Sequence, residues 1–358
     1  TPVTFEITKH AITITINGNG DTKEYNGNPQ TSETTVTPSC SDDLFDASKF
    51  SYTGATTITE TNVGSYSEAI DITKASYNDD NLNVTFEAGT PVTFEITKHA
   101  ITITINGNGD TKEYNGNPQT SETTVTPSCS DDLFDASKFS YTGATTITET
   151  NVGSYSEAID ITKASYNDDN LNVTFVAGTD VTFEITKHAI TITINGNGDT
   201  KEYNGNPQTS ETEVTPECSD SLFDASKFSY TGATTITETN VGNYSEEIDI
   251  TKAAYNDANL EVTFVAGTPV EFEITKKAVT ITINGSSDSK VYNGSAQTSE
   301  TEVTPECSDS LFDASKFSYT GATTITETNV GNYSEEIDIT KAAYNDANLE
   351  VTFVAGTP

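Results

Sequence analysis

The sequence FEITKHAITITI, residues 94–105, decides how this chain is built. It runs for twelve residues without a glycine, a proline or any other turn signal, and the same pattern returns at residues 183–194 and 272–283. If it is extended, the stretch spans about 40 Å at a rise of ~3.3 Å per residue. A flexible linker would be rich in glycine and serine. We therefore expect one strand to run directly into the next, with Lys98 and His99 at the crossing.

This stretch recurs because the whole chain repeats every 89 residues, so that Thr1 to Lys9 returns as Thr90 to Lys98. Units of 20–50 residues are typical of solenoids, whereas a unit of this length is within the range of a small independent domain. The alternative phase begins at Val3 and gives four complete domains. The preferred phase predicts a closing strand of a preceding repeat at residues 1–9, followed by domains at residues 10–98, 99–187, 188–276 and 277–358, the last without a closing strand of its own.

Within one repeat the pattern favours short strands. Residues 11–16, AITITI, alternate apolar and hydroxyl side chains, which is typical of a half-buried strand. A second strand is expected to stop at Pro38, and residues 41–47 are expected to form one or two helical turns with Ser41 as N-cap. About seven strands spaced by about ten residues predict a small antiparallel, immunoglobulin-like sandwich. The alternative is a β-grasp unit with residues 42–47 as a stunted helix.

Composition limits the classes of function. The chain has 54 acidic and 17 basic residues, a formal net charge of −37, and 33% apolar residues. Such a charge disfavours nucleic acid and anionic membranes as partners, and no apolar run is long enough to span a bilayer. No Ser/His/Asp, Cys/His or paired-carboxylate arrangement stands out, so we do not expect an enzyme. Both ends fall inside the repeating pattern, and we expect a stretch of a longer protein.

Several segments resemble a known family. They are the opening strand of residues 12–16, the Lys-x-Tyr-Asn-Gly segment of residues 23–27, the Thr-Asn-Val-Gly-Ser-Tyr segment of residues 61–66, and residues 81–96. In these features every repeat resembles the MBG/YDG-type domains of large bacterial cell-surface proteins and adhesins. The resemblance implies an extracellular, immunoglobulin-like stalk domain on the bacterial surface. It carries no catalytic residues.

One polar group is a candidate calcium site. Asn17, Asn19 and Asp21 occupy positions 1, 3 and 5, a spacing that calcium loops use for oxygen ligands. The glutamate expected at the twelfth position and the glycine expected at the sixth are both missing. A hairpin turn explains the same residues. No other cofactor is expected.

Each repeat has a single cysteine, so no disulfide can form within one unit. The alternatives are a small, half-buried apolar side chain and a thiol that bridges two chains. Neighbouring copies are expected to lie too far apart for a bond within the chain. The four thiols are Cys40, Cys129, Cys218 and Cys307.

The joint itself supplies the last candidate residues. Histidine occupies this position in three copies, at His10, His99 and His188, but the fourth copy has Lys277. Since a lysine cannot replace a metal-ligating histidine, we expect a solvated junction residue instead. The joint residues are Lys98, His99, Lys187, His188, Lys276 and Lys277.

These observations favour a structural protein. The expected function is a rigid, acidic stalk or fibre segment of a large microbial surface protein, whose copies assemble end to end by strand donation or in bundles. The alternative is an adhesin whose repeats each bind a glycan or host ligand weakly and gain strength from multivalency. For that alternative Tyr52, Tyr66 and Tyr77 would form a platform for sugars, although packing in the core explains them as well.

Overall fold

A computed structural model describes all residues of the chain, 1–358. The chain is all-β, as the sequence predicts, and its only helical segments are single 3-10 turns. It divides into two compact units, residues 1–186 and 187–358, and each unit contains two copies of the repeat. The structure has no helix of the length and apolarity needed to cross a membrane.

The first repeat contains ten strands and two 3-10 turns, and they set the pattern for the others. In chain order they are β1 (His10–Gly18), β2 (Gly20–Glu24), β3 (Gln30–Thr31), β4 (Val36–Ser39), η1 (Ala47–Lys49), β5 (Phe50–Tyr52), β6 (Thr59–Glu60), β7 (Gly64–Glu68), η2 (Ile72–Lys74), β8 (Ala75–Tyr77), β9 (Leu82–Ala88) and β10 (Val92–Thr97).

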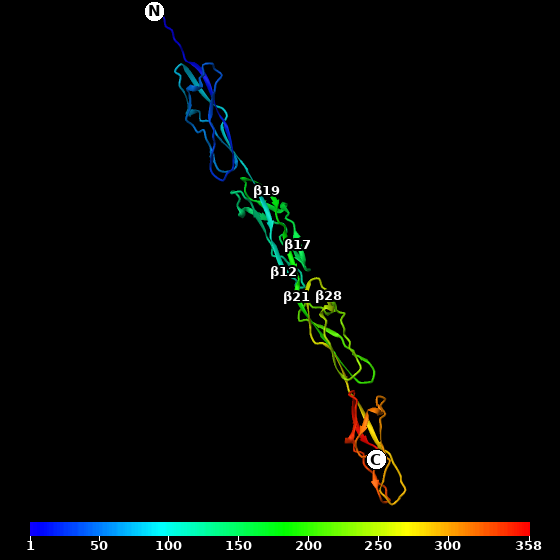
Figure 1. Cartoon of the computed structure of the whole chain (residues 1–358). Coiled ribbons are helices and arrows are strands. Elements are labelled where there is room, and N and C mark those ends of the chain that lie inside the picture. Colours follow the sequence, from blue (N-terminus) through cyan, green and yellow to red (C-terminus); the bar gives the residue numbers. More distant parts are fainter. The chain divides into compact units, whose positions relative to one another are not determined.

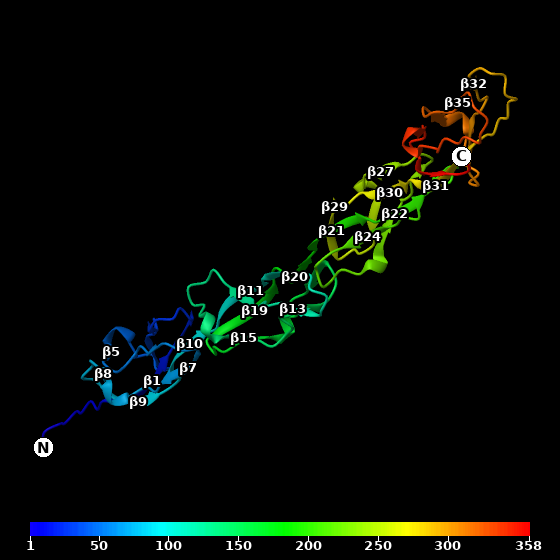
Figure 2. The ribbon, with the colours of Figure 1, turned by 90° about the horizontal axis from the view of Figure 1, so that it is seen from below.

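These strands form two three-stranded sheets, in the orders β4-β1-β9 and β2-β10-β7, and two small pairs, β3-β6 and β5-β8. The expectation of antiparallel pairing was wrong for two pairs, since β1 runs parallel to β9 and β10 runs parallel to β2. The closing strand β10 lies in the middle of its sheet, with β7 antiparallel on its other side. Figure 2 shows β5 and β8 at the end of the repeat near residue 1, and β7 and β10 at the end that leads into the second repeat.

The core forms because the alternation of β1 places Ile12, Ile14 and Ile16 on one buried face. Ile12 and Ile14 pack with Leu82 of β9, while Ile16 packs with Ile70 and with Val92 of β10. The closing strand also contributes Phe94 and Ile96, which are fully buried. The core of each repeat therefore includes one face of its closing strand.

Two local expectations were wrong. Pro38 does not end a strand but lies within β4, opposite Ile16. It is tolerated there because β4 is an edge strand, where a missing N–H costs no ladder hydrogen bond. Ser41 does not cap a helix. Instead the Asp42 carboxylate accepts the Leu44 N–H at 2.9 Å, and the 3-10 turn η1 follows, capped by Asp46.

The second repeat lies in the first unit and has the same sequence of elements. They are β11 (His99–Gly107), β12 (Gly109–Glu113), β13 (Gln119–Thr120), β14 (Val125–Ser128), η3 (Ala136–Lys138), β15 (Phe139–Tyr141), β16 (Thr148–Glu149), β17 (Gly153–Glu157), η4 (Ile161–Lys163), β18 (Ala164–Tyr166), β19 (Leu171–Ala177) and β20 (Val181–Thr186).

The second unit contains the third and fourth repeats. The third has β21 (His188–Gly196), β22 (Gly198–Glu202), β23 (Gln208–Thr209), β24 (Val214–Glu217), η5 (Ala225–Lys227), β25 (Phe228–Tyr230), β26 (Thr237–Glu238), β27 (Gly242–Glu246), η6 (Ile250–Lys252), β28 (Ala253–Tyr255), β29 (Leu260–Ala266) and β30 (Val270–Thr275). The fourth has β31 (Lys277–Gly285), β32 (Gln297–Thr298), β33 (Val303–Glu306), η7 (Ala314–Lys316), β34 (Phe317–Tyr319), β35 (Thr326–Glu327), η8 (Ile339–Lys341), β36 (Ala342–Tyr344) and β37 (Leu349–Ala355).

Three segments differ from this pattern. In the fourth repeat, residues 287–291 and 331–335, which correspond to β2 and β7, form no strands. Residues 1–9 have the sequence of a closing strand but likewise pair with nothing, and they extend away from the first repeat as a free segment (Figure 1). Within this segment Val3 is 99% exposed and Phe5 88%.

Candidate functional site at the joint between repeats

In both units the backbone passes from one repeat to the next without a linker. In the first unit β10 ends at Thr97 and β11 begins at His99, so Lys98 alone separates the two strands. In the second unit Lys276 alone separates β30 from β31. The side chains of Lys98, Lys187 and Lys276 are exposed, whereas those of His99 and Lys277 are half-buried. The first residue of the second strand, His99 or Lys277, is therefore the one placed to contact both repeats.

His99 connects carboxylates of two repeats. Its Nδ1 lies 2.6 Å from Glu24 Oε1 of the first repeat, and its Nε2 lies 2.7 Å from Asp131 Oδ2 of the second. Both partners can only accept, so the doubly protonated ring satisfies both. The hydrogen bond to Asp131 is the main reason that the pKa of His99 is raised above 6.5; burial opposes this shift and Glu24 adds to it. In return, His99 lowers the pKa of Asp131.

The second unit achieves the same connection with a different side chain. Lys277 Nζ lies 3.7 Å from Glu202 of the third repeat and 3.5 Å from Asp309 of the fourth. The ion pair between this position and the aspartate of the same repeat also occurs in the third repeat, where His188 Nε2 lies 2.7 Å from Asp220 Oδ2. The exchange of histidine for lysine thus preserves a cation between two carboxylates. The expectation of a solvated junction residue missed this role.

A polar relay forms a second connection across the joint. Asn170 of the second repeat accepts the Val63 N–H of the first at 2.8 Å. Its own N–H is donated to Asp168, which also accepts Lys138 Nζ at 2.7 Å. Burial alone would raise the pKa of Asp168, but the hydrogen bonds from Lys138 and Asn170 outweigh it, so this pKa is lowered. The second unit repeats the contact, since Asn348 accepts the Val241 N–H at 2.8 Å.

An apolar contact completes the joint. Tyr25 of the first repeat packs against the core cluster of the second, beside Leu133 and Phe134. Gly27 makes this approach possible, because its φ is +80° and a Cβ there would lie 2.8 Å from Leu133 Cδ2. In the second unit Gly205 meets Leu311 in the same way, at 2.6 Å. Backbone continuity, a bridging cation, a relay and an apolar contact therefore all restrain the same joint.

The structure assigns the calcium candidates other hydrogen-bond partners. Asn17 Nδ2 donates to Ser39 Oγ at 3.1 Å, and Asn19 Oδ1 accepts the Thr35 N–H at 2.7 Å. Asp21 accepts the N–H groups of Thr22 and Glu33 at 2.9 and 2.8 Å. These contacts hold neighbouring segments of the repeat together. Calcium binding at this position stays a prediction.

The four cysteines are free and half-buried. Cys40 packs against the cluster of Ile12, Ile14 and Leu82, and Cys129 packs against the equivalent cluster of the second repeat. This environment fits the small apolar side chain that the sequence favoured. A bridge between chains through Cys40, Cys129, Cys218 or Cys307 stays a prediction.

The tyrosines face the core or its rim. Tyr77 stacks on Phe45 with ring centroids 5.9 Å apart, and its hydroxyl accepts the Asp46 N–H at 2.8 Å. Tyr52 packs in the cluster around Ile16, and Tyr66 donates to the Asn62 carbonyl at 2.8 Å. Each ring is half-buried in its own repeat, which fits a packing role, and a stacking platform for sugars stays a prediction.

Comparisons with known proteins found similarity to solved structures alone, at low sequence identity. No family model matches it, and no curated protein matches it. Among solved structures, the eight N-terminal immunoglobulin domains of the Down syndrome cell adhesion molecule align with 92% of this chain and 51% of that one, at 10% identity and a TM-score of 0.19. Three N-terminal domains of the bacteriophage RB49 highly immunogenic outer capsid protein align with 74% of this chain and all of that one, at 12% identity and a TM-score of 0.15. This chain spans about half the length of the first structure. At these TM-scores neither alignment supports an argument about function.

Proposed function

We propose that this chain is a structural stalk or fibre segment of a large bacterial surface protein, in which the joints hold successive repeats in a fixed orientation. The observation that carries the proposal is the joint of the first unit, where one residue separates two strands and His99, Asn170 and Tyr25 each connect the two repeats. A mobile tether would have none of these contacts. The extracellular location rests on the resemblance to surface-protein repeats.

The acidic surface supports the same function. With a net charge of −37, neighbouring copies of the chain repel one another at low ionic strength. Repulsion keeps long, closely spaced proteins from adhering along their sides. The charge therefore suits a protein that is present in many copies on one surface.

The stalk proposal is tested by a distance distribution between two repeats of the first unit. Spin labels are placed at the exposed positions Ser51 and Ser140, in a chain whose four native thiols are replaced by alanine. We expect one narrow distribution, and a broad one after insertion of Gly-Gly-Ser between Lys98 and His99. A native distribution as broad as that of the insertion variant would contradict a fixed joint.

A second candidate function is a multivalent glycan-binding module. It is favoured by a hollow of about 450 Å³ over β22, β27 and β30 of the third repeat, whose lining includes Tyr244, Asp199 and Glu273. A ring beside carboxylates is a combination that can hold a sugar, and serial copies would add avidity. A glycan array probed with the whole chain distinguishes the candidates, because a pure stalk binds none of its sugars.

A further inference from the structure

The bridge of the first joint depends on a proton. The ring of His99 faces two carboxylates, Glu24 at the end of β2 and Asp131 in the segment before η3, at 2.6 and 2.7 Å. A charged imidazole donates from both nitrogens, whereas a neutral one donates from one nitrogen and accepts at the other. An ionised carboxylate can only accept. A neutral ring can therefore hold only one of the two partners.

The two carboxylates are not held equally well. Asp131 also accepts the Leu133 N–H at 2.9 Å, and its side chain is 28% exposed. The side chain of Glu24 is 58% exposed, and His99 is the one group with which its carboxylate pairs. The proton of a neutral ring therefore stays on Nε2 beside Asp131. The unprotonated Nδ1 then faces Glu24, whose carboxylate can turn to solvent.

The other groups around the ring do not replace this contact. Strand β11 pairs with β19, and the Asn170 carbonyl accepts the backbone N–H of His99 at 3.2 Å. Of the charged residues nearby, Lys138 and Asp168 pair with each other at 2.7 Å, and Lys98 is exposed. The carboxylate of the preceding repeat is thus the partner that the ring loses with its charge.

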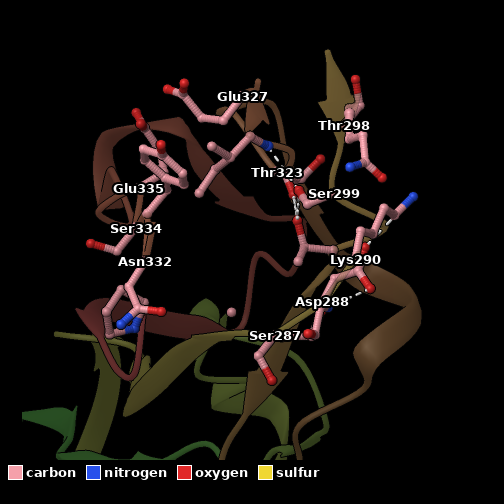
Figure 3. A pocket seen from close by; sticks show the side chains of 18 of the residues that line it. Ser287, Asp288, Lys290, Thr298, Ser299, Thr323, Glu327, Asn332, Ser334 and Glu335 are labelled. Atoms are coloured by element: carbon pink, nitrogen blue, oxygen red, sulfur yellow. Dashed lines mark hydrogen bonds and ion pairs between the residues drawn. The ribbon is translucent and has the colours of Figure 1, made fainter. Parts of the chain in front are cut away.

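Elsewhere in the chain, lysine is the cation between two carboxylates. Lys290 of the fourth repeat lies 3.8 Å from Asp288 and 3.1 Å from Glu300, and Figure 3 shows Lys290 beside Asp288. At the joint of the second unit Lys277 has the same role. An ammonium has three donors and no acceptor, so it presents no lone pair to either carboxylate. The first joint differs because its bridging group is an imidazole.

We infer that the first joint is a proton-controlled coupling, in which the protonated ring ties two repeats together and loss of its proton releases Glu24 while the pair with Asp131 remains. The contact that is lost lies between repeats, so the core of each repeat is unaffected. The inference rests on the proposed function, because it assigns to one joint of the stalk a stiffness that falls as the pH rises.

The direction follows from two pKa shifts. The hydrogen bond to Asp131 is the main reason that the pKa of His99 lies above 6.5, and the hydrogen bond from His99 is the main reason that the pKa of Asp131 lies below 3.8. The pair of charges is therefore complete between pH 3.8 and 6.5 and is lost as the pH rises through the raised value of His99.

Two backbone amides report on the two joints. The Val63 N–H crosses the first joint and the Val241 N–H crosses the joint of the second unit, each donating at 2.8 Å to an asparagine of the following repeat. Their hydrogen exchange is measured in the whole chain and divided by the intrinsic rate at each pH, so that base catalysis cancels.

As the pH rises through the titration of His99, protection of the Val63 N–H should fall by about 2- to 5-fold, which is the effect of losing an exposed ion pair. Protection of the Val241 N–H should stay constant over the same range. Equal behaviour of the two amides would overturn the inference.

Variants of Glu24 separate the proton from the contact. Glu24→Gln should make Val63 protection independent of pH, because an amide can accept from the charged ring and donate to the neutral one. Glu24→Ala should give the high-pH value of the native chain at every pH. Glu24 is exposed, so neither change should alter the fold. A pH dependence that persists in Glu24→Ala would contradict the proposed release.

His99→Lys copies the joint of the second unit into the first, and it too should remove the pH dependence. The distance distribution between labels at Ser51 and Ser140 separates this inference from the stalk proposal. A broad distribution at every pH would contradict the fixed joint and, with it, the coupling. A narrow distribution, together with Val63 protection that ignores the pH, would overturn the proton control alone.

Discussion

The first and fourth repeats contain nearly the same segment, GSYSE at residues 64–68 and GNYSE at residues 331–335, yet only the first forms a strand there. The two segments differ in the strand beside them. In the first repeat β7 pairs with the closing strand β10, whereas residues 331–335 of the fourth repeat pair with no strand. The other sheet of the fourth repeat, β33-β31-β37, forms as in the first, and Ile281 and Ile283 are fully buried. Each repeat therefore has one sheet that forms without the closing strand and another that depends on it.

The largest effect should come from weakening the closing strand of the first repeat. Phe94→Ala removes a fully buried ring from the central strand, and we expect a loss of about 3–5 kcal/mol in the free energy of unfolding of that repeat. Hydrogen exchange at residues 20–24 and 64–68 should then approach that of residues 287–291 and 331–335. Phe5→Ala is the control at the equivalent but exposed position and should leave these rates unchanged. Equal exchange in native and Phe94→Ala chains would show that the sheet does not depend on β10.

A smaller effect should appear at the apolar contact of the joint. Leu133→Ala removes a half-buried side chain that packs beside Tyr25, and we expect a cost of about 1–2 kcal/mol, at or below the lower end for a buried leucine. Leu44→Ala makes the same change where no preceding repeat covers the side chain, and it should cost much less. Denaturant unfolding of the two variants provides the comparison. If both cost the same, the contact across the joint contributes no stability.

The smallest effect should be the pH dependence of the first joint. Because the pKa of His99 is raised in the folded state, its contribution is complete below about pH 6.5 and is lost as the pH rises through the raised value. Titration of His99 by NMR should give a midpoint above 6.5, and Glu24→Gln should lower it. The joint of the second unit has Lys277 in place of the histidine and provides the comparison. A midpoint that Glu24→Gln leaves unchanged would argue against the bridge.

The sequence predicted the strands better than their partners. The alternation of residues 11–16 identified β1 and its buried face, because side-chain period is a local property. The parallel pairing of β1 with β9 could not be predicted in this way, since period does not state which strand lies alongside or in which direction. Pro38 misled for the same reason: only the position of β4 at an edge makes a proline acceptable.

The joint shows the same limit. The absence of turn residues in residues 94–105 placed His99 at the crossing. Its carboxylate partners Glu24 and Asp131 are 75 and 32 residues away in the sequence, so no local pattern connects them. Asn170 and Leu133 were not singled out either, since an asparagine in a turn and a leucine near a cysteine have ordinary local explanations. Both residues recur, as Asn348 and Leu311. In a chain of near-identical repeats almost every residue recurs, so this recurrence did not distinguish them.

The parallel pairing of β1 with β9 has a mechanical consequence. A force applied along the chain enters the first repeat at His10, where β1 begins, and leaves at Thr97, where β10 ends. The ladder from His10–Leu82 to Ile16–Ala88 and the ladder from Thr93–Gly20 to Thr97–Glu24 both lie along this path. Tension would therefore slide the paired strands past one another, so that many hydrogen bonds share the load instead of opening one at a time.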